Sequence, residues 1–191
     1  MIIGVTGATG AGKTTFVRYL FSKGFEHLSL SDLIRNELAL RNMEVTRKNL
    51  QDVGNEMRRK FGLGFWAKKA LEIMRPGHNY VIDSIRNPGE VASLAASGNF
   101  TLFAVAAPLD ARFSRMACRP ERAEKEPVTL AAFKASEGRE VGSADAYRQQ
   151  LEECVRLARV TIANDSGLAE FFARIDAGLE GIRAENRRSE I

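Results

Sequence analysis

The chain has 191 residues, of which 45% are hydrophobic and 27% are charged. These proportions are ordinary for a globular protein and exclude a largely disordered chain. The length suits one well-buried domain. The net charge is +4, but basic and acidic residues are interleaved instead of gathered in one run, so nucleic acid is not the expected partner.

Two further classes are excluded because their sequence signals are absent. The chain has no apolar run of about 18 residues or more, which a membrane helix needs. Its two cysteines, Cys118 and Cys154, lack C-x-x-C spacing, so neither a zinc site nor a disulfide framework is predicted. We therefore expect a cytoplasmic protein without zinc or a membrane partner, as a monomer or a homodimer.

Apolar runs alternate with helical patterns along the chain. This alternation predicts βαβ units, and therefore a parallel sheet with helices on both faces. The strands are expected near residues 1–6, 26–30, 79–83, 100–106 and 160–163. We expect a single α/β domain over residues 1–182, followed by a polar tail over residues 183–191 that frays.

A glycine-rich loop follows the first expected strand directly and matches the phosphate-binding pattern G-x-x-x-x-G-K-[ST]. The residues expected to contact a nucleotide here are Gly7, Ala8, Thr9, Gly10, Ala11, Gly12, Lys13, Thr14 and Thr15. Glycines let backbone N–H groups turn toward an anion, and the next helix adds the positive end of its dipole. Lys13 is expected to reach the β- and γ-phosphates and Thr14 to bind Mg²⁺. The alternative is an ordinary glycine-rich turn, which rarely matches all the fixed positions.

A long segment without strand signals separates Leu30 from Asn79. Its helix signals include Thr46 as an N-cap and Gly62 as a stop. Such a helical insertion is expected to form a substrate-binding flap, and we place this acceptor flap at about residues 32–75.

A polar segment over residues 115–127 follows the fourth expected strand. Arg112, Arg115 and Arg119 recur at i, i+3 and i+7, which places them on one helical face. Phosphoryl transfer spreads negative charge over the transferred group, and a closing lid can bring guanidinium groups to it. We therefore predict a short lid in which Arg119 and Arg115 are catalytic. A solvated arginine face is the alternative.

Two acidic–basic segments follow the second and third expected strands: Asp32 with Arg35, and Asp83 with Arg86. A carboxylate at such a strand end can contact the water shell of Mg²⁺, and an arginine three residues on can bind a phosphate. The alternative for the first segment is that Asp32 complements a helix dipole and Arg35 is solvated. For the second segment it is a turn with an exposed arginine.

These segments resemble those of the P-loop nucleoside monophosphate kinases. That family carries Gly-Asp-x-x-Arg after the second strand and Asp-Gly-x-x-Arg after the third, whereas this chain has Ser31 and Ser84 in place of the glycines. The resemblance implies a P-loop NTPase fold, with a five-stranded parallel sheet in the order 2-3-1-4-5, and ATP and Mg²⁺ as cofactors. It also implies that Arg35 and Arg86 bind the acceptor phosphate.

In the same family the carboxylates orient the metal waters or the acceptor, which gives those roles to Asp32 and Asp83, with Thr14 and Asp83 at the metal. The turn after the fifth expected strand begins at Asn164 and resembles that of dephospho-coenzyme A kinases, where it lies beside the adenine. Taken over its length, the chain is similar to monophosphate-kinase-like proteins, some of which are joined to deoxycytidylate deaminases.

The sequence thus predicts an enzyme that transfers the γ-phosphoryl group of ATP to a small-molecule nucleotide acceptor, a nucleoside or deoxynucleoside monophosphate. Two alternatives remain open. One is a dephospho-coenzyme A kinase or another small-molecule kinase, in which Asp32 would be the base on an acceptor hydroxyl. The other is an ATP-binding switch or partner protein with slow turnover.

Overall fold

The computed structural model describes residues 1–118, 129–131, 133–134 and 145–189. The strands are β1 (Ile2–Thr6), β2 (Glu26–Ser29), β3 (Tyr80–Asp83), β4 (Phe100–Ala106) and β5 (Val160–Ala163). They pair in parallel in the order β2-β3-β1-β4-β5. The expected strands and their order are confirmed, and the fold is that of the P-loop NTPases.

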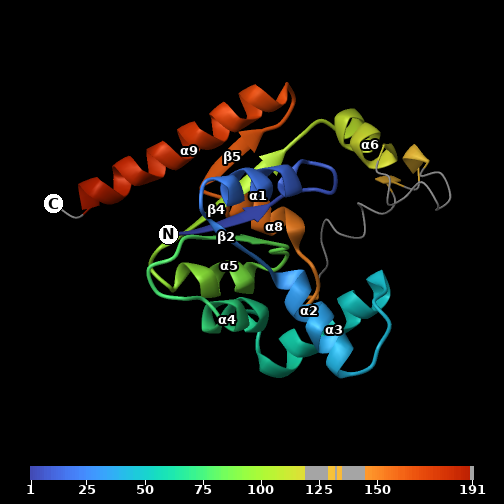
Figure 1. Ribbon diagram of the computed structural model, residues 1–191. Helices are drawn as coiled ribbons and strands as arrows, with labels where there is room; N and C mark the ends of the chain where they lie inside the picture. Colours follow the sequence, from blue (N-terminus) through green and yellow to red (C-terminus); the bar gives the residue numbers. More distant parts are fainter. Residues whose placement is uncertain (119–128, 132, 135–144, 190–191) are drawn as a thin grey trace.

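Helices cover both faces of the sheet (Figure 1). They are α1 (Lys13–Ser22), α2 (Leu30–Leu40), α3 (Arg47–Phe61), α4 (Phe65–Glu72), α5 (Pro88–Ala95), α6 (Leu109–Ala117), α8 (Leu151–Arg156) and α9 (Leu168–Ser189). Among the described residues, none of these helices combines the length and the apolarity that crossing a bilayer requires.

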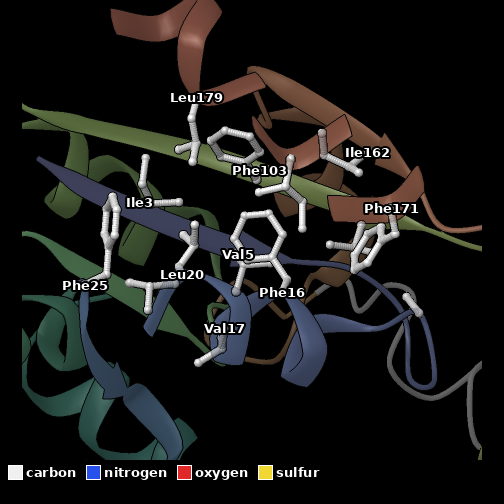
Figure 2. Packing of buried hydrophobic residues seen from close by; sticks show 14 of the residues in the cluster. Ile3, Val5, Phe16, Val17, Leu20, Phe25, Phe103, Ile162, Phe171 and Leu179 are labelled. Atoms are coloured by element: carbon white, nitrogen blue, oxygen red, sulfur yellow. The ribbon is translucent and has the colours of Figure 1, made fainter. Parts of the chain in front are cut away.

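Each face of the sheet carries its own hydrophobic core, because successive strand residues point to opposite faces. Ile3, Val5 and Phe103 pack toward α1 and α9 in the cluster that Figure 2 shows. Ile82 and Leu102 belong to the other cluster, together with residues of α2, α4 and α5. This alternation decides which strand-end side chains face α1 and the loop before it.

The predicted flap region contains α2, α3 and α4, joined by short non-helical connections. Thr46 caps α3, since its side chain accepts a hydrogen bond from the Asn49 N–H at 3.1 Å. Gly62 ends α3 with a φ of 100°, as its stop signal predicted. Trp66 of α4 is buried in the cluster that also includes residues of α2 and α5, so the region contributes to the core.

The C-terminal tail differs from the expectation. Helix α9 continues to Ser189, so residues 183–189 are helical where fraying was expected. The reason is that Ile175, Leu179 and Ile182 stay buried along one stripe of α9, and Glu185 forms an ion pair with Arg159 beyond it.

The core of Figure 2 supports a matched stability test. Phe103 is 0% exposed and packs against Phe16 at 5.4 Å between ring centroids, whereas Phe21 is 65% exposed. We expect Phe103→Ala to lower the free energy of unfolding by about 3–5 kcal/mol, because it leaves a cavity between the sheet and α1. Phe21→Ala should change it by no more than ~0.5 kcal/mol in the same urea titration. Equal losses in the two variants would contradict this assignment of the core.

Candidate functional site

The loop between β1 and α1 has the backbone that its glycines permit. Gly7, Gly10 and Gly12 have φ values of 136°, 80° and 115°, a region that other residues enter only with strain. The Lys13 ammonium group donates hydrogen bonds to the Gly7 and Ala8 carbonyls at 2.6 and 2.9 Å. The predicted phosphate-binding lysine therefore lies against the loop itself.

Neighbouring segments enclose this loop closely. A side chain at Gly7 would bring its Cβ to 2.3 Å from the Val105 carbonyl oxygen of β4. At Gly12, the Cβ would lie 2.1 Å from the Asn164 amide nitrogen. The loop is thus held between β4 and the turn after β5, where only glycine leaves enough space.

Asn164 and two arginines of α6 brace the loop through its carbonyls. The buried Asn164 side chain donates to the Ala11 carbonyl at 2.7 Å. Arg115 donates to the Asn164 carbonyl at 2.9 Å and to the Ala11 carbonyl at 3.3 Å. Arg112 contacts the Thr9 carbonyl at 3.4 Å. The expected adenine-side Asn164 and the expected lid residue Arg115 are therefore brought together at the loop.

The structure does not describe most of the predicted lid. Arg119 and residues 119–127 of the predicted lid lie outside the described residues. Arg112 entered the sequence analysis only as a member of the arginine face, and its contact with the loop depends on how α6 packs.

Asp83 lies at the end of β3, opposite Ser29 of β2 in the sheet register. It faces α1, because Val81, two residues earlier, belongs to the core beneath α1. His27 lies 3.4 Å from Asp83 Oδ2. Within the described residues, Asp83 Oδ1 is buried and has no hydrogen-bond partner. One carboxylate oxygen thus lies beside His27, and the other has no hydrogen-bond partner among the described residues.

The charge state of this pair follows from its surroundings. Burial alone would raise the pKa of Asp83, but hydrogen bonds from His27, Ser29 and Ser84 outweigh it, so the pKa of Asp83 lies below its usual value. The hydrogen bond with Asp83 raises the pKa of His27, against the opposing effect of burial. Asp83 is therefore a carboxylate at neutral pH.

Three serine hydroxyl groups join the ends of β2 and β3. Ser29 and Ser84 lie within hydrogen-bond distance of Ser31, at 3.0 and 3.2 Å, and 3.2 Å from each other. Ser84 has a φ of 61°, a conformation that glycine adopts at lower cost. The two predicted acidic–basic segments therefore lie side by side.

The two predicted acceptor arginines differ in how they are held. Arg35 is exposed and donates to Asp32 at 2.5 Å and to Ser31 at 2.9 Å, so its position depends on weak surface contacts. Arg86 is partly buried and donates to Gln149 at 3.0 Å. The side chain of Arg86 is thus held by a residue far away in the chain, whereas that of Arg35 is held by exposed neighbours on its own helix.

Sequence reasoning missed His27 as the partner of Asp83. The signal was present, because His27 precedes Ser29 by two residues on β2 and therefore shares its face of the sheet. Recognising it required the register of β2 against β3, which no local pattern supplies.

The parallel sheet in this order, with a phosphate loop between β1 and α1, defines a P-loop protein with a kinase-like fold. The chain belongs to the family described as AAA domain, which matches residues 3–141. It also belongs with the UPF0200 proteins: it is 30% identical over 181 residues to the UPF0200 protein of Methanothrix thermoacetophila, covering 94% of this chain and 96% of that relative.

Solved structures of kinases share the fold. A gluconokinase from Sinorhizobium meliloti 1021 superposes with a TM-score of 0.58 at 15% identity and covers 98% of this chain and 95% of its own. A dephospho-CoA kinase from Campylobacter jejuni gives a TM-score of 0.54 at 17% identity, with 97% and 98% coverage. These likenesses show that the chain shares the fold of these kinases.

Two glycine variants distinguish the effect of a side chain that crowds the loop from the effect of strain in the backbone. Gly12 and Gly24 both have positive φ, but a Cβ at Gly24 meets no atom within 4 Å. We expect Gly12→Ala to displace Asn164 from the Ala11 carbonyl, at a cost of about 1–3 kcal/mol beyond that of Gly24→Ala, and to weaken ATP binding by roughly 10-fold. Calorimetric titration with ATP measures the dissociation constant of each variant. Equal affinities in the two variants would show that Asn164 does not brace the loop.

Proposed function

We propose that this protein transfers the γ-phosphoryl group of ATP to the phosphate of a nucleoside or deoxynucleoside monophosphate. The observation that carries the proposal is the side-by-side position of residues 31–35 and 83–86, which three serine hydroxyls join at the ends of β2 and β3. Both segments supply a carboxylate and an arginine next to the phosphate loop, as a phosphate acceptor requires.

On the ATP side, the charge of Lys13 would move from the loop carbonyls to the β- and γ-phosphates. Backbone N–H groups of the loop and the start of α1 add a positive potential. Phosphoryl transfer depends mainly on positioning and charge neutralisation. Arg112, Arg115 and Asn164 support this step by keeping the loop in shape.

The residues present fit a magnesium ion. Asp83 offers the buried carboxylate oxygen that lacks a partner among the described residues, and Thr14 lies in the first turn of α1 beside the loop. Thr14 would bind the ion through its hydroxyl and Asp83 through water, as hard oxygen ligands do. When bound, the ion supplies positive charge to the β- and γ-phosphates.

On the acceptor side, Arg86 is the better-held arginine and Arg35 the more mobile one. An acceptor phosphate carries about two negative charges, which need charged hydrogen-bond partners once water is excluded. Arg86 would provide a fixed partner, and Arg35 would leave its exposed pair with Asp32 to provide a second. Asp32 would then orient the acceptor.

The acceptor screen distinguishes the proposed function from its alternatives. ADP release is measured with each ribo- and deoxyribonucleoside monophosphate, with dephospho-coenzyme A, and without acceptor. Rapid ADP formation only with monophosphates supports the proposal. Turnover with dephospho-coenzyme A favours that kinase instead, and slow acceptor-independent release favours an ATP-binding switch.

Lys13 tests the ATP side. We expect Lys13→Ala to keep the fold and to lower kcat by at least ~100-fold, because it removes positive charge from the transferred group. Lys68→Ala, on the exposed face of α4, serves as the matched control and should match the wild type. Near-normal turnover in Lys13→Ala, with any acceptor, would contradict the assignment of the loop.

Arg35 and Arg86 test the acceptor side. Removing either guanidinium should cost about 2–4 kcal/mol of acceptor binding, a fall of roughly 30- to 1,000-fold in kcat/KM for the monophosphate. The KM for ATP should change only a few-fold. Arg156→Ala, which removes an exposed arginine of α8, is the control. If the arginine variants weaken ATP binding and spare the acceptor, the monophosphate kinase assignment fails.

A further inference from the structure

A buried polar network lies behind Arg86, outside the residues assigned so far. Its members are Arg58 of α3 and Asn87 and Glu90 around the start of α5, which are 3%, 0% and 0% exposed. Buried charges are costly unless they are paired and hydrogen-bonded. A fully satisfied charged network at this place therefore needs a structural or functional reason.

Glu90 is the centre of the network and uses both carboxylate oxygens. Its Oε2 accepts the backbone N–H groups of Arg86 and Asn87 at 2.9 and 3.1 Å. Its Oε1 accepts two N–H groups of the Arg58 guanidinium, Nε at 2.9 Å and Nη2 at 2.7 Å. The same carboxylate thus fixes the backbone at Arg86 and ties that backbone to α3.

The segment that begins at residue 145 forms hydrogen bonds with Arg86 and Asn87 as well. The Asn87 side chain donates to the Ala146 and Arg148 carbonyls at 2.7 and 3.0 Å. The Gln150 N–H donates to the Arg86 carbonyl at 2.8 Å, and Gln149 accepts from the Arg86 guanidinium. Hydrogen bonds from this network therefore hold both the backbone and the side chain of Arg86.

We propose that Glu90 and Arg58 are positioning residues for the acceptor phosphate: through the backbone of Arg86 they set the direction in which its guanidinium points. The inference rests on the proposed function for the identity of the acceptor. The hydrogen bonds themselves do not depend on it. Displacement of a binding group by about 1 Å is enough to lower turnover by up to ~100-fold, so loss of the Arg58–Glu90 pair should weaken use of the acceptor more than use of ATP.

The experiment compares Arg58→Met with Arg59→Met and Lys48→Met. Because Arg59 pairs with Asp145 of the segment that holds Asn87, a second variant, Lys48→Met, serves as the independent control: Lys48 is exposed and pairs with Asp52 on the same helix. Amide exchange at Arg86 and Asn87, measured by NMR without any substrate, should quicken by roughly 10-fold in Arg58→Met and stay unchanged in Lys48→Met. The KM for the monophosphate should rise roughly 10- to 100-fold in Arg58→Met, with the KM for ATP within about 2-fold of wild type.

Arg58→Lys is the conservative variant and decides the case if Arg58→Met does not fold. A lysine keeps the charge beside Glu90 but loses the two-pronged contact, so its amide exchange and acceptor KM should lie between those of the wild type and Arg58→Met. The inference would be overturned if the Arg58 variants changed the thermal midpoint but left amide exchange at Arg86 and Asn87 unchanged. An equal rise in the KM for the monophosphate and the KM for ATP would overturn it too. If no monophosphate is a substrate, the proposed function fails, and the substrate-free exchange still decides whether Arg58 fixes the backbone at Arg86.

Discussion

β1 lies at the centre of the parallel sheet, with β3 on one side and β4 on the other, and the phosphate loop leaves its carboxyl end. This position constrains the rest of the site. The loop has to fit between the end of β4 and the turn after β5, which leaves no space for a side chain at Gly7 or Gly12. The ends of β2 and β3 must then lie on its other side, because parallel strands end at the same edge of the sheet.

The site therefore has two halves that different elements support. On one half, α6 and the turn after β5 hold the loop through Arg115 and Asn164. On the other, α3 and the chain after residue 144 hold the start of α5 through Arg58 and Asn87. Asp83 lies where the halves meet, with one oxygen toward His27 and the other unpartnered among the described residues.

The two halves of the site also explain why Arg86 and Arg35, which follow neighbouring strands, differ in the contacts that hold their side chains. Arg86 precedes the capping box of α5, in which Glu90 and Asn87 satisfy the first N–H groups of the helix. Arg35 lies inside α2, and its side-chain hydrogen bonds within the described part of the chain go to neighbours one turn away on that helix.

The sequence by itself determined where the strands lie along the chain, the phosphate loop, the cap at Thr46 and the stop at Gly62. Each of these features depends on neighbouring residues and on backbone conformations that particular residues favour. Resemblance to known kinases added the sheet order and the expected acceptor role of the two acidic–basic segments. Only the tertiary structure decided that His27 faces Asp83, that Arg112 and Arg115 reach the loop, and that Arg58 pairs with Glu90. These contacts join residues far apart in the chain, and their geometry depends on strand register and helix packing, which no local pattern encodes.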